Sequence, residues 1–259
     1  RTGAKLVTPE IPLPLPSAQA AVDAVKAALT SRTKLLLIDH IVSLTGCVLP
    51  VRAMADAAHA VGAKVLIDGA HAPGHIPLAM PETGADWYVG NLHKWLFVPR
   101  ACGMLWAKGE ARNAIHPLAI SHGLGQGMTA EFDWTGTHDP TAILCVPAAI
   151  AFHAKLGGPV LMQRNATLLR EAVDLLAAAF QTPLGAAPDL FASMGTVALP
   201  SRFGTTEAEA HALRHKLSQD HSIEAIVSAQ KGTLWLRLAA QGYNEIADYA
   251  RLRDVLLSL

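Results

Sequence analysis

The stretch "KLLLIDHIVSLTGCVLPVRAMADAAHAVGAKVLID", residues 34–68, decides the fold class. Residues 34–39 form a continuous apolar run, which is typical of a strand buried on both faces of a sheet. A helix is expected to begin at Pro50, a residue favoured in a first helical turn, and to end at Gly62. Residues 64–68 form a second apolar strand. Strand, helix and strand at this spacing predict a βαβ unit and therefore a parallel sheet with a right-handed crossover.

The segments on either side extend this α/β pattern. We expect a helix over 17–31, further strands of the same sheet at 86–90 and 103–107, loops over 109–140, and mostly helix over 141–182 with a break at 157–159. Beyond them we expect strands at 194–199, 223–228 and 232–238 and helices at 206–219 and 243–258. This order predicts an α/β large domain over 1–150, connecting helices over 151–184 and a smaller α+β domain over 185–259.

Composition excludes several classes of protein. With 51% hydrophobic residues the chain can bury a sizeable core. Its 21 basic and 21 acidic side chains cancel, and no basic run stands out, which argues against nucleic acid or an anionic membrane as a partner. No apolar stretch is long enough to span a bilayer, and no signal-peptide pattern is present. Three cysteines without CxxC spacing favour a reduced, cytoplasmic protein.

Two short stretches could carry chemistry. In "DGAHAPG", residues 68–74, Asp68 follows a predicted strand, at the edge of a parallel sheet where ligands bind. In "GNLHKW", residues 90–95, Lys94 follows the next strand. Taken singly, Asp68 could equally be a structural turn residue, and Lys94 a solvated surface charge. Together they suit a Schiff-base lysine and an acid for the pyridinium nitrogen of pyridoxal phosphate (PLP).

The chain resembles the class V aminotransferases of PLP fold type I, within them the isopenicillin N epimerase-like branch. The resemblance runs over essentially all residues and is carried by "LLLIDHIVSLTGCVLPV" (35–51), "VLIDGAHAPG" (65–74), "GADWYVGNLHKWLFVPRACGMLWAK" (84–108), "FDWTGTHDPTA" (132–142) and "LRLAAQGYNEIADYARL" (236–252). It implies an α/β fold in which a mostly parallel sheet is flanked by helices, a smaller C-terminal α+β domain, and PLP as cofactor.

The resemblance also implies roles around the cofactor ring. Lys94 matches the lysine that forms the Schiff base and moves the substrate's α-proton. Asp68 matches the carboxylate that pairs with the pyridinium N–H, and His71 matches a residue near the ring hydroxyl. Ser43 falls where the family places a second contact to that hydroxyl, and a turn hydroxyl is the alternative.

Other matches concern the phosphate and the substrate. Asn91 and His93 match donors on the phosphate side. Thr137 matches a threonine that reaches the phosphate of the neighbouring subunit's cofactor, which implies a homodimer with its active site at the subunit interface. Arg237 matches the arginine that binds the substrate α-carboxylate, and a structural salt bridge is the alternative.

Two further readings of the sequence are disfavoured. His71 and His75, like His211 and His215, are spaced as zinc ligands on a helix, but no third convergent ligand accompanies either pair, so no metal site is expected. Cysteine desulfurases, also class V, use a nucleophilic cysteine in the C-terminal part. The last cysteine here is Cys145, which disfavours that activity.

Family members are longer at the N-terminus, where they carry the phosphate-binding loop. Nothing before Lys34 matches that loop, so we expect the chain to be a fragment rather than a shortened paralogue. The expected activity is PLP-dependent chemistry at Cα of an amino acid, of the epimerase or aminotransferase type. A PLP-dependent C–S lyase is the alternative. A non-catalytic dimeric remnant of the same fold is the alternative of another class.

Overall fold

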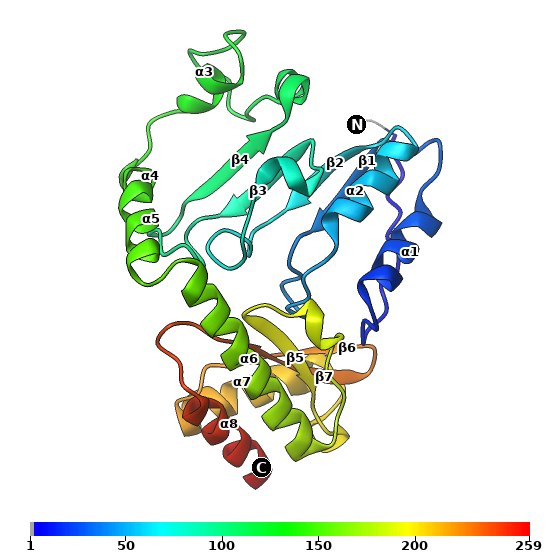
Figure 1. Ribbon diagram of the computed structural model, residues 1–259, viewed down its shortest axis with the longest axis vertical. Helices are drawn as coiled ribbons and strands as arrows, with labels where there is room; N and C mark the ends of the chain where they lie inside the picture. The colour runs from blue at the N-terminus through cyan, green and yellow to red at the C-terminus, as the bar shows by residue number, and fades with distance from the viewer. Residues whose placement is uncertain (1–2) are drawn as a thin grey trace. The chain divides into compact units, whose positions relative to one another are not determined.

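The structure, a computed structural model, describes residues 3–259 and divides into two compact units. We call the first the lysine unit; it comprises Leu29–His40 and Val51–Lys155. The second, the arginine unit, comprises the described residues up to Ala28 together with Ile41–Pro50 and Leu156–Leu259. Each unit has its own sheet (Figure 1) and is described separately.

The lysine unit is built on a four-stranded sheet in the order β1 (Leu35–Asp39), β2 (Lys64–Asp68), β3 (Trp87–Asn91) and β4 (Gly103–Ala107). The first three strands are parallel, and β4 is antiparallel to β3. Helix α2 (Val51–Ala60) packs against β1 and β2 (Figure 1). The α/β fold with a mostly parallel sheet is therefore confirmed, and β2 ends at the residue expected to carry chemistry.

Strand β1 corrects one expectation. Its apolar run predicted burial on both faces, yet Leu35 and Leu37 are 50% and 62% exposed while Ile38 is buried. Side chains alternate between the two faces of a strand. An apolar run therefore indicates two covered faces only where both have packing partners, and among the described residues one face of β1 is open.

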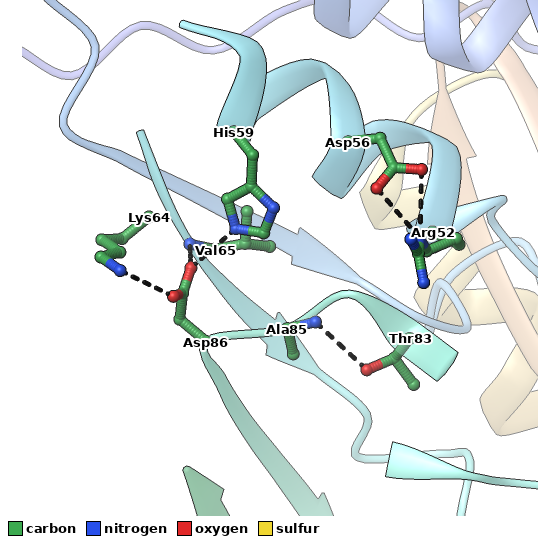
Figure 2. Close-up of polar contacts among 8 residues, drawn as sticks. All are labelled: Arg52, Asp56, His59, Lys64, Val65, Thr83, Ala85 and Asp86. Carbon is green, nitrogen blue, oxygen red and sulfur yellow. Dashed lines mark hydrogen bonds and ion pairs between the residues drawn. The ribbon is translucent and has the colours of Figure 1, made fainter. Parts of the chain in front are cut away.

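An ion cluster closes the other end of this sheet (Figure 2). The buried carboxylate of Asp86, just before β3, lies 2.9 Å from Nε2 of His59, 3.0 Å from Nζ of Lys64 and 2.9 Å from the amide of Val65, which donates to it. Burial raises the pKa of Asp86, but these three donors together outweigh burial and lower the pKa below its usual value. The cluster ties the end of α2 to the starts of β2 and β3.

Beyond the sheet and α2, the lysine unit contains short helices joined by loops, and one segment differs from expectation. Helices α4 (Thr141–Leu144) and α5 (Val146–Lys155) lie within the predicted helical stretch. The expected loop over 109–140 instead contains the 3-10 helix Gly109–Ala114 and helix α3 (Met128–Asp133). The Glu131 carboxylate lies 2.6 Å from Nδ1 of His116 and accepts a bond from the Gly125 amide, so polar contacts fold this segment where apolar periodicity gives no signal. A further 3-10 helix spans Met80–Thr83.

The arginine unit has an antiparallel three-stranded sheet in the order β5 (Met194–Ala198), β7 (Thr233–Ala239) and β6 (Ile226–Gln230). Its helices are α1 (Ala18–Ala28), α6 (Pro159–Phe180), α7 (Glu207–His221) and α8 (Ile246–Ser258). Short 3-10 helices span Pro188–Leu190 and Ser201–Phe203. Its core is a cluster of buried aliphatic side chains from α6, α7, α8 and the sheet. Among the described residues, no helix is long and apolar enough to cross a membrane.

Candidate active site

The loop between β3 and β4 carries Lys94. Leu92, Val98 and Cys102 form a small buried cluster with Ala149 of α5, which anchors both ends of the loop. The side chain of Lys94 is exposed between these anchors. The lysine is therefore presented by a loop that packing holds in place.

The neighbouring His93 is fixed to the far end of the same loop. Its Nδ1 lies 2.7 Å from the carbonyl oxygen and 3.1 Å from the amide nitrogen of Cys102. This double contact with one backbone position orients the ring. Asn91, the last residue of β3, is half-buried and pairs with Gly103.

The turn after β2 carries Asp68 and His71. The amide of Ala70 donates to Oδ1 of Asp68 over 2.9 Å, and no other hydrogen bond to this carboxylate occurs within residues 3–259. Gly69 is required here because a Cβ atom would lie 2.0 Å from the Tyr88 hydroxyl. One oxygen of the half-buried Asp68 therefore remains available to a ligand.

A network of four side chains, which we call the lysine network, joins the turn to the loop. Nζ of Lys94 lies 3.2 Å from Nε2 of His71, and Nε1 of Trp95 donates to Nδ1 of His71 over 3.3 Å. His75 stacks on Trp95 with ring centroids 3.9 Å apart, and its Nδ1 lies 3.0 Å from the carbonyl oxygen of His71. Burial lowers the pKa of His75 to about 3, so its ring is neutral near pH 7.

Gly74 allows these two segments to approach closely. Its φ of +79° lies in the left-handed region, and a Cβ atom would stand 2.6 Å from the carbonyl oxygen of Trp95. Nε2 of His153 on α5 lies 3.0 Å from the carbonyl oxygen of Gly74 and holds the turn from its other side. The spacing of the lysine network therefore depends on a glycine at this position.

A second carboxylate lies beside Asp68. Asp39 ends β1 as Asp68 ends β2, and the two residues are paired in the parallel register. Paired residues of parallel strands point to the same face, here the face that also carries Leu35 and Leu37. Burial, and then the charge of Asp68, raise the pKa of Asp39. The carboxyl edge of the sheet thus concentrates negative charge.

Beneath this edge, a neutral pair supports the turn. Nδ1 of His40 lies 2.8 Å from the hydroxyl of the buried Tyr88, and the His40 amide donates to the carbonyl oxygen of Asp68. Burial lowers the pKa of His40 to about 4, and burial followed by the charge of Asp68 raises the pKa of Tyr88. Neither ring is charged near pH 7, so the pair supports the turn without neutralising Asp68.

The arginine unit brings together two other predicted residues. Nη1 of Arg237, on β7, donates to the carbonyl oxygen and to Oγ of Ser43, over 2.5 and 3.4 Å. The Ser43 turn is held against β5 by Gly46, whose φ is +74° and whose Cβ would stand 2.6 Å from the carbonyl carbon of Met194.

The guanidinium of Arg237 retains its charge within this contact. It forms no ion pair with a carboxylate of the described chain, which removes the structural salt bridge as its explanation within residues 3–259. Burial lowers the pKa of Arg237. Within the described chain the hydrogen-bond partners of Arg237 are neutral oxygens, so its guanidinium can still pair with an anion.

Thr137 is exposed in the loop between α3 and α4. Sequence reasoning gave no role to Trp95 and considered His75 only as a metal ligand. The structure makes both part of the lysine network, and the one available signal was the adjacency of Trp95 to Lys94 together with the 71/75 spacing. No group of three or more His, Cys, Asp or Glu suited to a metal ion occurs in the part of the chain that the structure describes.

Comparison with known proteins places these features in a family. A family model described as "Aminotransferase class-V" matches residues 2–221. An L-cysteine desulfhydrase of Arabidopsis thaliana is 31% identical over the whole chain and 63% of its own length. An isopenicillin N epimerase of Streptomyces clavuligerus is 33% identical over the whole chain and 68% of its own length.

Solved structures share the fold. The cystine C–S lyase C-DES, in complex with its reaction product cysteine persulfide, matches with a TM-score of 0.76 and 20% identity over 91% of this chain and 64% of its own. A cysteine desulfurase of Thermococcus onnurineus NA1 matches with a TM-score of 0.73 and 18% identity, over 93% of this chain and 63% of its own. The chain spans about 60% of the length of curated relatives that it matches. With a family model matched over most of its residues, the chain belongs to the class V aminotransferase family.

Proposed function

We propose that this chain is part of a PLP-dependent enzyme that acts at Cα of an amino acid. The observation that carries the proposal is the 3.2 Å approach of Lys94 Nζ to His71 Nε2, in the same unit as Asp68 at the end of β2. An exposed amine on an anchored loop suits covalent attachment of an aldehyde cofactor. The name of a solved relative, a C-DES variant with glycine covalently linked to the PLP cofactor, supports this choice of cofactor.

The residues present fit PLP. The free oxygen of Asp68 would accept the ring N–H, Lys94 would hold the cofactor covalently, and His71 would lie near the ring hydroxyl. When bound, PLP supplies an electron sink for negative charge that develops at Cα. The charge of Asp68 would keep the ring nitrogen protonated, and Lys94 would carry the α-proton.

The remaining predicted residues would complete the site. Asn91 and His93, at the end of β3 and the start of the Lys94 loop, would donate on the phosphate side. Arg237 would bind the substrate carboxylate, a task that suits a charged guanidinium with no ion pair to a carboxylate among residues 3–259. Ser43 would contact the ring hydroxyl, and it lies in the same unit as Arg237, which donates to its Oγ.

Two reaction types are supported equally. The similarity to an isopenicillin N epimerase favours epimerisation, in which Cα loses its proton and regains one on the opposite face. Transamination, in which the proton would go to the cofactor carbon instead of Cα, belongs to the same type. The similarity to L-cysteine desulfhydrases and to the C-DES fold favours cleavage of a C–S bond in a sulfur amino acid. Burial raises the pKa of the Cys47 and Cys102 thiols, so both are poor nucleophiles and do not favour a desulfurase.

We also propose a cytoplasmic homodimer in which Thr137 reaches the partner's cofactor. Thr137 is exposed, and α4 and α5 beside its loop carry exposed apolar side chains, namely Ile143, Leu144, Ile150 and Phe152. Such a cluster is typical of a protein–protein contact. The cysteines are free thiols, in keeping with a reducing compartment. Light scattering of the purified protein gives the oligomeric state, and a monomer would contradict this part of the proposal.

Covalent capture tests the cofactor. PLP is added to the purified chain, the adduct is reduced with borohydride, and peptide mass spectrometry locates the label. Lys94 is expected to carry it in the wild type. Lys94→Ala is expected to lose both the label and the visible absorbance, while Lys26→Ala, which changes an exposed lysine of α1, keeps them.

The outcome also separates enzyme from remnant. If Lys94 stays unlabelled both here and in the full-length protein, the chain is a non-catalytic member of the fold. Labelling only in the full-length protein would place the missing part of the site outside these residues. Products from an amino-acid panel then identify the reaction. C–S cleavage would give sulfide, ammonia and a keto acid, and epimerisation would give solvent deuterium at Cα with inversion. Transamination would give a keto acid without ammonia, because the amino group passes to an added second keto acid.

A further inference from the structure

The geometry points to Trp95 as a positioning residue that fixes which nitrogen of His71 carries the proton, so that His71 donates to Nζ of Lys94 and holds it as a neutral amine. This inference rests on the proposed function, because only a neutral amine attacks the carbonyl carbon of an aldehyde cofactor. It concerns the protein before any cofactor binds.

The first step of the argument is the direction of the Trp95 bond. An indole N–H is a donor only. Since Nε1 of Trp95 donates to Nδ1 of His71, that ring nitrogen must hold its lone pair toward Trp95. A neutral imidazole has one N–H, so the proton of neutral His71 lies on Nε2.

The second step follows at the other side of the ring. Nε2 of His71 faces Nζ of Lys94 at 3.2 Å. If Nε2 carries the proton, Nζ must accept it and therefore present a lone pair, which an ammonium group does not have. The alternative, an ammonium donating to a bare Nε2, would need a proton on Nδ1 and would set two N–H groups against each other at Trp95.

The third step is that Trp95 cannot easily turn away. The ring of His75 stacks on it at 3.9 Å and an interplanar angle of 21°. The carbonyl oxygen of His71 can only accept, so Nδ1 of His75 carries a proton toward it. His75 is therefore held by the backbone of His71 and in turn covers one face of the Trp95 indole. This stacking keeps the indole N–H directed at the His71 ring.

The titratable groups of the packed segments are few. The turn after β2 contributes Asp68, His71 and His75, the Lys94 loop contributes His93, Arg100 and Cys102, and α5 contributes His153 and Lys155. His75 is neutral near pH 7 for the reason given above. Removing the Trp95 donor is therefore expected to act on Lys94 through the His71 ring.

Two measurements on the cofactor-free chain test the inference, using Trp95→Phe to keep an aromatic partner for His75. Nitrogen NMR of ¹⁵N-histidine protein, with the His71 signals identified by their loss in His71→Asn, is expected to show a proton on Nε2 and none on Nδ1. Competitive acetylation followed by peptide mass spectrometry reports the pH midpoint of Lys94 reactivity, with exposed Lys26 as an internal reference. In Trp95→Phe this midpoint is expected to rise by about one pH unit, a tenfold loss of neutral amine near pH 7.

Trp87→Phe is the matched control, because it also removes an indole donor, here to the Ala111 carbonyl oxygen at 2.9 Å. Its Lys94 midpoint is expected to stay at the wild-type value. A proton on Nδ1 of His71 in the wild type, or an unchanged midpoint in a folded Trp95→Phe variant, would overturn the inference. Neither measurement uses PLP, so a chain that fails to bind PLP but shows both effects would retain the inference and lose the proposed function.

Discussion

Asp39 and Asp68 end adjacent parallel strands in matching register, so two carboxylates project from the same face of the sheet at its carboxyl edge. Within residues 3–259 neither forms an ion pair. Burial and the charge of Asp68 raise the pKa of Asp39, which means that folding disfavours its ionised form. The fold therefore holds an unfavourable pair of charges at the place where a cationic ring is proposed to bind.

Asp39→Asn is expected to stabilise the cofactor-free chain near pH 7 by a few tenths to about 1 kcal/mol, the range for like charges facing each other across strands. Because the folded pKa is raised, wild-type stability falls as the pH rises from the usual aspartate value through the folded value. The extra stability of Asp39→Asn should therefore vanish below the usual aspartate pKa, where Asp39 is protonated in both states. Urea unfolding at several pH values measures the free energy of unfolding of both proteins. PLP affinity of the same variant should fall, and a variant with lower stability at pH 7 would contradict the repulsion.

Asp86→Asn is expected to destabilise the lysine unit by about 1–3 kcal/mol, since a buried acceptor of three donors loses its charge. The pKa of Asp86 is lowered in the fold, so its contribution is full at neutral pH and is lost as the pH falls through the folded value. The variant should lose part of the acid dependence of stability. Asp56→Asn is the control, since its pair with Arg52 is exposed on both sides and should contribute little. Equal effects of the two changes would rule out a special role for the cluster.

Gly74→Ala and Gly62→Ala compare two glycines with the same φ of +79°. At Gly62 a Cβ atom meets open space, so the change should destabilise by about 1–2 kcal/mol through backbone strain alone. At Gly74 the Cβ atom would meet the Trp95 carbonyl, so the loss should reach about 3 kcal/mol or more and Lys94 labelling should weaken. Chemical denaturation measures the difference. Similar losses at both sites would mean that the turn and the Lys94 loop are not in contact.

His40 and His75 are expected to make the fold sensitive to mild acid. Their folded pKa values are lowered by burial to about 4 and about 3, whereas an unfolded histidine titrates near 6.5. Their contribution is therefore complete above the unfolded value and is lost progressively as the pH falls from about 6.5 toward the folded values, with a slope of up to about 1.4 kcal/mol per pH unit for each histidine. Unfolding at pH 7, 6 and 5 should show a shallower slope for His75→Gln. An unchanged slope in a folded His75→Gln variant would contradict this prediction.

Arg237→Lys tests the carboxylate site of the proposed enzyme. The lysine keeps the charge but lacks the planar fork, so amino-acid binding should weaken by about ten-fold or more while PLP capture by Lys94 is unchanged. Titration of the loaded protein with an amino acid gives the affinity. Arg170→Lys, an exposed arginine of the same unit, should leave it unchanged. Retained affinity in Arg237→Lys would assign the carboxylate to another residue.

Local patterns predicted much of the fold. Apolar runs predict the parallel strands β1 and β2, and the signals at Pro50 and Gly62 predict the start and end of the helix between them. Both kinds of signal depend only on neighbours in sequence. Helix α3 was missed because a buried Glu131 with polar partners fixes its segment, a contact without periodicity. The exposure of Leu37 was missed because a strand's composition does not state which elements cover it.

The candidate site divides in the same way. Asp68 and Lys94 could be proposed from the sequence because Asp68 ends one predicted strand and Lys94 follows the next strand closely. The bond from Trp95 back to His71, and the stacking of His75 on the indole, arise only when two loops more than twenty residues apart in sequence are packed together. Spacing along the chain gives no sign of such a contact, and the adjacency of Trp95 to Lys94 acquires meaning only in three dimensions.

Negative charge is neutralised at one end of the lysine unit's sheet and not at the other. The resulting electric field would orient an approaching charged ligand. Asp86 at the amino end is matched by cationic and amide donors, whereas Asp39 and Asp68 at the carboxyl end leave their field uncancelled by any ion pair of the described chain. A ligand with a positively charged group, such as a pyridinium nitrogen, would be attracted to the carboxyl end before contact. Such steering weakens with ionic strength, so the rate of capture should respond to salt more strongly than the stability of the captured state.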